Sequence, residues 1–363
     1  MKPQKQKKYL WILSTLLPIV GLTGILLYQQ FAQPLLLWVP LLFIYVGIPL
    51  LDLVFSIDVS NPNDEQVLEL EQTVFFDWVL YLLLPIHFFV FCYTINFMVS
   101  EPLTLWMHGV LIVTLGVFGG LVVNLGHELG HKKSRVSKNL AKLALASGAY
   151  GHFNIEHNAG HHREVATPED TASSRMGESI YRFVFRELPG GFKRAWRIET
   201  QRLARKGLAW YSIDNQILHS YLLTVFIFAT ITWVLGITAL LILILHVPVV
   251  WWQLTSANYI EHYGLLRQKN ADGKYERCEP WHSWNSNHLI SNLVLFHLQR
   301  HSDHHANPAR GYQSLRHFDQ APQLPAGYMG MFILAYIPPL WFKVMDKKLM
   351  RMYGDDVSLI NQL

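Results

Sequence analysis

Six apolar stretches, each long enough to cross a lipid bilayer, most strongly limit how this 363-residue chain can fold. The hydrocarbon core of a bilayer is about 30 Å thick, a distance that roughly 20 apolar residues span as a helix. Hydrophobic residues make up 51% of the chain, more than an ordinary soluble domain of this length contains. The sequence therefore predicts an all-α integral membrane protein with six transmembrane helices. Their predicted ranges are Tyr9 to Gln29, Leu35 to Ile57, Val74 to Val99, Leu103 to Leu125, Ile217 to Leu235 and Ile237 to Ala257.

The 30 lysines and arginines all fall on one side of these predicted spans. Four lie in the first eight residues, 15 lie between spans four and five, and 11 follow span six. Because Lys and Arg are retained on the cytoplasmic side of a membrane, both termini are expected in the cytoplasm. The net charge of +4 then reflects membrane orientation rather than nucleic-acid binding.

This charge pattern divides the chain into four parts. Residues 1–125 contain four transmembrane helices, and residues 126–216 form a cytoplasmic segment. Residues 217–257 contain two further transmembrane helices, and residues 258–363 form a C-terminal cytoplasmic segment. The two cytoplasmic segments are expected to form one mostly helical cap.

Histidines cluster in four short motifs on the predicted cytoplasmic side, "HELGHK", "EHNAGHH", "NYIEHYG" and "RHSDHH". Separations of three or four residues bring side chains to one face of a helix, so each motif could present two or three imidazoles to a common point. Neutral imidazole is the commonest metal ligand, and these motifs are far richer in histidine than the chain as a whole, which has 18 in 363 residues. The expected metal ligands are His127, His131, His157, His161, His162, His262, His301, His304 and His305.

Nine imidazoles exceed the four ligands that one zinc ion uses, so two metal ions are expected. Imidazole suits iron, copper, nickel and zinc, so the ligand type alone leaves the metal open. Each motif also carries an acidic residue, and metal-bound histidines commonly donate their second ring N–H to a carboxylate. Because adjacent residues on a helix point about 100° apart, each acid is expected to support a histidine of a different motif. These candidate supporting acids are Glu128, Glu156, Glu261 and Asp303.

Two other functions are compatible with parts of this pattern. "HELGH" matches the H-E-x-x-H motif of zinc proteases, but this motif would leave the other seven motif histidines without a role. A metal permease would place polar ligands near the middle of its spans, whereas these motifs lie at the predicted ends. A carboxylate-bridged di-iron bundle is excluded, because within the four motifs only Glu128 and His131 fit its Glu-x-x-His pattern.

The four motifs, in this order, resemble the signature motifs of the integral-membrane alkane 1-monooxygenases, the alkane hydroxylases of hydrocarbon-degrading bacteria. The resemblance extends to "ATPEDTASSRMGESIYRF" and "SWNSNHLISNLVLFHLQRHSDHH", while "NYIEHYGL" is the motif that separates these enzymes from the related membrane fatty acid desaturases. It implies a non-haem di-iron centre with all nine motif histidines as iron ligands, in a bacterial inner membrane. The implied reaction inserts one atom of dioxygen into the terminal methyl group of a medium- or long-chain n-alkane, giving a primary alcohol. A membrane fatty acyl desaturase or hydroxylase is the closest alternative.

The electrons for such a reaction are expected to come from another protein. The chain has no G-x-G-x-x-G dinucleotide motif, and Cys92 and Cys278 are too few for an iron–sulfur site. The resemblance implies that a rubredoxin, reduced by a rubredoxin reductase, is the donor. Rubredoxins are generally acidic, and the predicted cap carries 26 of the 30 basic residues, so docking on the cap is expected. The positive-inside bias alone explains the same charge equally well.

Overall fold

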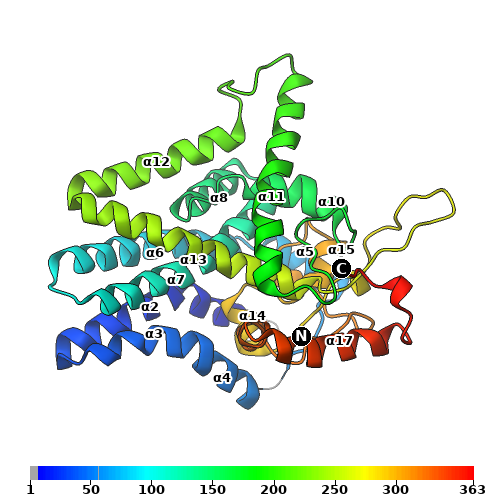
Figure 1. Ribbon diagram of the computed structural model, residues 1–363, viewed down its shortest axis with the longest axis horizontal. Helices are drawn as coiled ribbons and strands as arrows, with labels where there is room; N and C mark the ends of the chain where they lie inside the picture. Colours follow the sequence, from blue (N-terminus) through cyan, green and yellow to red (C-terminus); the bar gives the residue numbers. More distant parts are fainter. Residues whose placement is uncertain (1–6, 56) are drawn as a thin grey trace.

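The computed structural model describes residues 7–55 and 57–363, and it confirms the expected all-α membrane fold with six helices long and apolar enough to cross a bilayer. Figure 1 shows them lying side by side, with the short turns within each pair of consecutive spans at one end of the bundle and most of the remaining elements at the other. The first described residues and the C-terminus both lie at that second end (Figure 1). Lys2 and Lys5, which contribute to the charge pattern, lie outside the described residues. The six spans are Lys8–Phe31 (η1 Lys8–Trp11 and α2 Ile12–Phe31), Pro34–Val54, α6 Phe75–Ser100, α7 Leu105–His131, α12 Gln216–Leu235 and α13 Ile237–Glu261.

Two of the spans continue past their predicted ends. Helix α7 runs to His131 rather than Leu125, and α13 runs to Glu261 rather than Ala257. The added turns carry polar residues, which an apolar pattern reads as the end of a span. In the structure these polar side chains face the interior, so helical hydrogen bonding continues through them.

The second span is irregular where prolines interrupt it. It consists of η2 (Pro34–Trp38), α3 (Val39–Leu42), the π-helix η3 (Phe43–Gly47) and α4 (Ile48–Val54). Its three prolines each stand in the first two positions of a helical piece, where a missing N–H costs no hydrogen bond. The predicted end at Ile57 is wrong, because the helix stops at Val54 and Ile57 pairs with His288 in an isolated bridge.

The other elements are short, apart from α11 (Ile180–Ala204), which runs across the ends of the spans in Figure 1. No β-sheet forms among the described residues, which contain only isolated bridges. Helices α16 (Tyr328–Ala335) and α17 (Pro338–Met352) are long and apolar enough only when taken together, and they are bent by 117° to one another, so they add a broken span or a re-entrant pair at most. The remaining helices are α5 Asp64–Gln72, α8 Arg135–Ser147, α9 Phe153–Glu156, η4 His157–His161, α10 His162–Glu164, η5 Pro280–His282, α14 Leu289–Val294, α15 His301–Ala306, η6 Tyr312–Ser314, α16 Tyr328–Ala335, α17 Pro338–Met352 and η7 Val357–Leu359.

Glycines allow α7 and α13 to pack closely in the part of the bundle next to the histidine motifs. A Cβ atom on Gly116 would lie 2.3 Å from Cβ of Val249, and one on Gly120 would lie 2.4 Å from Cβ of Gln253. Small residues permit this close approach between transmembrane helices, where packing replaces the hydrophobic effect as the driving force. The "GVFGG" run at 116–120 therefore acts first as a helix-packing surface.

We expect Gly116→Ala to destabilise the protein by roughly 1–3 kcal/mol, because the new methyl group would overlap the branched Val249 side chain and approach the carbonyl oxygen of His246. Gly109→Ala on the same helix is the matched control, since no atom lies within 4 Å of its added Cβ. That control should be neutral or stabilising by up to about 1 kcal/mol through helix propensity. Thermal unfolding of both variants in detergent measures the difference, and equal melting temperatures would contradict the packing argument.

Candidate metal centre

All nine motif histidines come together at the cap end of the bundle, in two groups. Within each group the candidate ligand atoms lie within 4.8 Å of one another. The first group contains His127, His131, His157, His162 and His304. The second group contains His161, His262, His301 and His305.

The rings in each group face one another through Nε2. In the first group, Nε2 of His304 lies 3.0 Å from Nε2 of His127. In the second, Nε2 of His301 lies 3.1 Å from that of His262 and 2.9 Å from that of His305. An ion about 2.1 Å from two nitrogens at right angles would hold them about 3.0 Å apart, so the residues fit a bound metal ion in each group.

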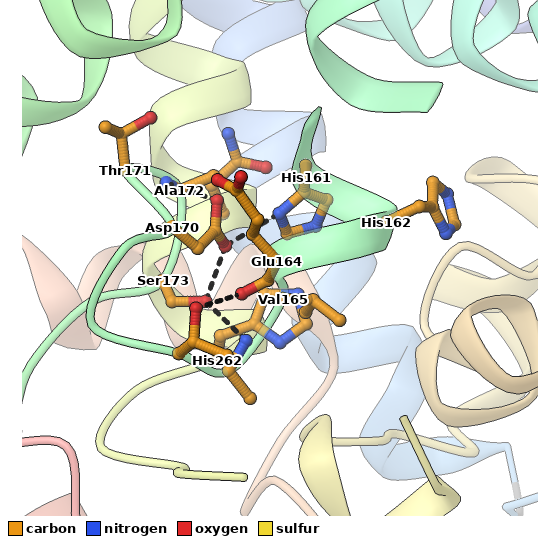
Figure 2. Close-up of polar contacts among 12 residues, drawn as sticks. His161, His162, Glu164, Val165, Asp170, Thr171, Ala172, Ser173 and His262 are labelled. Carbon is orange, nitrogen blue, oxygen red and sulfur yellow. Dashed lines mark hydrogen bonds and ion pairs between the residues drawn. The ribbon is translucent and has the colours of Figure 1, made fainter. Parts of the chain in front are cut away.

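A π-helix divides the second motif between the two groups. His157 and His161, four residues apart, were expected to share a point, but they belong to different groups. The segment His157–His161 is the π-helix η4, whose wider turn brings residues five apart into register. His157 therefore pairs with His162, at 3.0 Å between the Nε2 atoms, while His161 turns toward the second group. Figure 2 shows the rings of His161 and His162 on opposite sides of this segment.

Regular helical spacing explains the other pairs. His127 and His131 stand four apart on the last turns of α7 and share the first group. His301 and His305 stand four apart on α15 and share the second, whereas His304 points to the first. Helix α15 therefore contributes to both groups.

Burial keeps most of these imidazoles neutral. Desolvation lowers the pKa of His262 to about 3, and it lowers the pKa values of His157 and His301 well below the usual range. A neutral imidazole has a free lone pair, which is the form that binds metal. The ring nitrogens of these neutral histidines can therefore bind a cation.

Comparisons with known proteins agree with this geometry. The fatty acid desaturase family model matches residues 104–335, which include all nine histidines. Over 98% of its length, the chain is 50% identical to an alkane 1-monooxygenase of Ectopseudomonas oleovorans, of which it covers 88%. It is 41% identical to an alkane 1-monooxygenase of Acinetobacter baylyi, covering 99% of this chain and 89% of that protein. It is also 27% identical over 69% of its length to the hydroxylase component of a xylene/toluene monooxygenase of Pseudomonas putida, of which it covers 66%.

The chain belongs to the alkane 1-monooxygenase family.

Four acids were expected to support the motif histidines of this alkane 1-monooxygenase family member. Of these acids, only Glu261 contacts a motif histidine. Its Oε2 lies 3.3 Å from Nε2 of His301, in a different motif, as expected. That nitrogen faces the second group, so Glu261 lies beside the position of an ion rather than behind a ligand.

The other three acids bind elsewhere. Glu128 accepts a hydrogen bond from the backbone N–H of Tyr312 at 3.2 Å. Glu156 pairs with Arg194, and Asp303 pairs with Arg310 at 2.5 Å. These carboxylates hold the cap together instead of orienting the metal ligands.

The carboxylate that does orient one of the nine histidines is Asp170, which sequence reasoning missed. Nδ1 of His161 lies 2.9 Å from Oδ2 of Asp170, and Figure 2 shows the carboxylate turned toward the ring. An Nδ1–H that donates to this carboxylate leaves the Nε2 lone pair free for the second group. Burial opposes a charged His161, but Asp170 raises its pKa above the usual value. The only sequence signal was its place in "ATPEDTASS", nine residues after His161.

Arg194 of α11 in turn holds Asp170 in place. Its Nη2 donates to Oδ1 of Asp170 at 2.8 Å, and its Nη1 donates to Glu164 at 2.9 Å. The guanidinium is only 4% exposed, so these hydrogen bonds form away from water, where charge-assisted contacts are strong. Helix α11 thus fixes the orientation of His161 through two successive side chains.

An apolar cavity leads from the spans to both histidine groups. Its empty space, which includes some open solvent, is about 640 Å³, and His127, His157 and His301 stand at its inner end. Glu261 and Tyr328 supply polar atoms there. The remaining wall is contributed mainly by Ile44, Val117, Gly120, Leu121, Phe153, Leu254, Ala257, Leu295, Leu298, Met329 and Phe332.

We expect Asp170→Asn to weaken metal binding about 10- to 100-fold, because the amide no longer offers His161 a negatively charged acceptor. Elemental analysis should find about two metal ions per wild-type chain and fewer in the variant after dialysis against a weak chelator. Glu169→Gln is the matched control, since this exposed neighbour binds only Tyr275 across the loop. Equal metal retention in Asp170→Asn and the control would refute the orienting role.

Proposed function

We propose that this chain is an alkane 1-monooxygenase that hydroxylates the terminal methyl group of medium- or long-chain n-alkanes. The observation that carries the proposal is the apolar cavity that ends at both histidine groups. An alkane offers no hydrogen-bonding group, so only an apolar wall and its shape can bind and align it. The names of the relatives support the same substrate class.

The proposed cofactor is a pair of non-haem iron ions. His127, His131, His157, His162 and His304 would hold one ion, and His161, His262, His301 and His305 the other. When bound, this di-iron group supplies the activation of dioxygen and the transfer of one oxygen atom to the substrate. Imidazole ligands without sulfur suit iron, and the family supports the choice.

The side chains of this chain position the substrate. Ile44, Val117 and Leu121 line the cavity away from the histidines and exclude water from the alkane. Because the histidines stand only at the inner end, an alkane that enters from the bilayer presents its terminal methyl group first. The unpartnered Glu261 Oε1 and the Tyr328 hydroxyl then offer the product alcohol polar contacts at that end.

The proposed electron donors are a rubredoxin and its rubredoxin reductase. The histidine groups lie at the cap end of the bundle, so an electron has a short path from a protein bound on the cap. The cap is the basic side of the molecule, which favours a small, salt-sensitive contact with an acidic partner.

The proposed location is the bacterial inner membrane, with both termini in the cytoplasm. The described ends of the chain share the cap side of the bundle (Figure 1), and the basic residues favour the cytoplasm for that side. We further propose that residues 1–125 and 217–257 form the membrane parts of the chain and that residues 126–216 and 258–363 form the cap.

Membranes that contain this protein should convert an n-alkane into the primary alcohol, with one oxygen atom derived from dioxygen. The reason is the alignment of the alkane by a cavity that opens to the histidines at one end only. The measurement is incubation with a series of n-alkanes, electron donors and ¹⁸O-labelled dioxygen, followed by mass spectrometry of the products. A predominance of internal alcohols would contradict the alignment, and alkenes formed from a fatty acyl substrate would favour a desaturase.

The purified chain should be inert with a nicotinamide cofactor and alkane until rubredoxin and its reductase are added. Turnover should then fall as salt rises, because added ions screen contacts between exposed charges. The measurement is alcohol formed per minute across a salt series. Turnover by the chain alone would refute the partner, whereas salt-independent turnover would refute only the charged docking surface.

A further inference from the structure

A second hollow, lined largely by cations, opens beside the first histidine group. It lies between the end of α7, helix α8, the region of η4 and the start of α12, and it encloses about 1200 Å³ of open space. No Asp or Glu belongs to its lining in the part of the chain that the structure describes. The cations of this basic groove are Lys132, Lys133, Arg135, Lys138 and Lys142.

Little within the protein neutralises this charge. Lys132 pairs with Asp77 of α6 at 2.9 Å. Lys142 donates to the neutral side-chain oxygen of Gln216, and Lys138 is exposed and has no ion partner among the described residues. Four of the five cations therefore have no ion partner among the described residues, and such concentrated positive charge favours an anionic ligand.

The contacts of α8 place the groove at the level where the membrane begins. Thr224, eight residues into α12, donates to the carbonyl oxygen of Ala146 at 3.0 Å. The C-terminal end of α8 therefore lies about 12 Å inside the start of that span, and Figure 1 shows α8 lying alongside the spans. Lys142 instead meets Gln216, the first residue of α12. The other two cations of α8 lie about 6 and 10 Å farther out along its axis.

We propose that the basic groove binds the phosphate headgroup of an anionic phospholipid. The headgroup layer adds roughly 5–8 Å to each side of the hydrocarbon core, so it covers the levels of Lys142 and Lys138, with Arg135 just beyond its outer edge. Basic pockets between transmembrane helices at this depth suit lipid phosphates. A globular donor protein approaches from the water phase and is a poorer match for Lys142, which is half-buried at the level of Gln216.

The groove also touches the metal centre, which gives a bound lipid a consequence. His131, a member of the first histidine group, belongs to its lining together with Gly130. A headgroup bound there would neutralise the cations that follow the end of α7 and hold that end in place. The lipid therefore stabilises the folded chain around the first histidine group.

The test is thermal unfolding of the full chain in a neutral detergent during titration with phosphatidylglycerol. Saturating lipid should raise the melting temperature of the wild type by roughly 3–6 °C, since a ligand that binds only the folded state stabilises it. Phosphatidylcholine should produce no comparable rise. The double variant Lys138→Gln/Lys142→Gln should lose most of the shift, with a rise of about 1 °C or less.

The matched control is Lys269→Gln/Lys274→Gln, which removes the same charge from two exposed positions in the loop at residues 269–275. It should keep the full lipid-induced rise. If the double groove variant does not fold, Lys138→Gln alone replaces it, because this exposed side chain has no hydrogen bond to lose, and it should weaken apparent lipid affinity several-fold.

Three results would overturn the proposal. One is an equal rise with inorganic phosphate at the same concentration, which would assign the groove to a small anion. Another is an unchanged lipid response in the groove variants. The third is no lipid response together with a raised KM for reduced rubredoxin at unchanged kcat, which would assign the groove to the donor protein. Because unfolding requires no turnover, failure of this test leaves the proposed enzymatic function intact.

Discussion

The meeting of nine imidazoles inside one end of a helical bundle is the constraint on which the rest of this structure depends. Ring nitrogens that face one another at about 3 Å in a buried site, such as Nε2 of His301 and His305, lose water without gaining enough donors to replace it. A cation in each group would resolve that conflict, because each neutral imidazole would then direct its lone pair at positive charge. The extended ends of α7 and α13 and the placement of α15 all serve to bring these rings together.

The backbone separates the two histidine groups through one departure from regular helix. In an uninterrupted α-helix, His157 and His161 would share a face and point to the same group. The π-helix η4 sends His161 to the second group, and Asp170 fixes the resulting ring orientation. Arg194 makes this arrangement depend on α11, a helix whose amphipathic sequence alone would assign it only to the membrane surface.

The sequence is informative wherever local spacing determines the structure, and it is less informative where distant segments meet. Apolar runs and histidine clustering are enough to predict the six spans and the set of candidate ligands. Their division into five and four depends on η4, whose wide turn has no signature in the letters HNAGH. The role of Asp170 has no sequence signature either, because a loop brings this residue back to His161. Glu156, the acid within the same histidine motif, pairs with Arg194 instead. A position next to a histidine in the sequence therefore did not predict which acid contacts which candidate ligand.

One helix, α13, contributes both to helix packing in the membrane and to the wall of the cavity beside the histidines. Along α13, Gln253 packs over Gly120, and then Ala257 and Glu261 line the path to the second histidine group. Residues four apart on a helix share a face, so one stripe of α13 changes from a helix-packing surface to a substrate wall and then to a polar end. Because an alkane forms no hydrogen bonds, the shape of the cavity must align it, and the cavity keeps its shape only if its walls are rigid. The glycine contacts between α7 and α13 supply that rigidity, because close-packed helices leave the wall little room to move toward or away from the substrate.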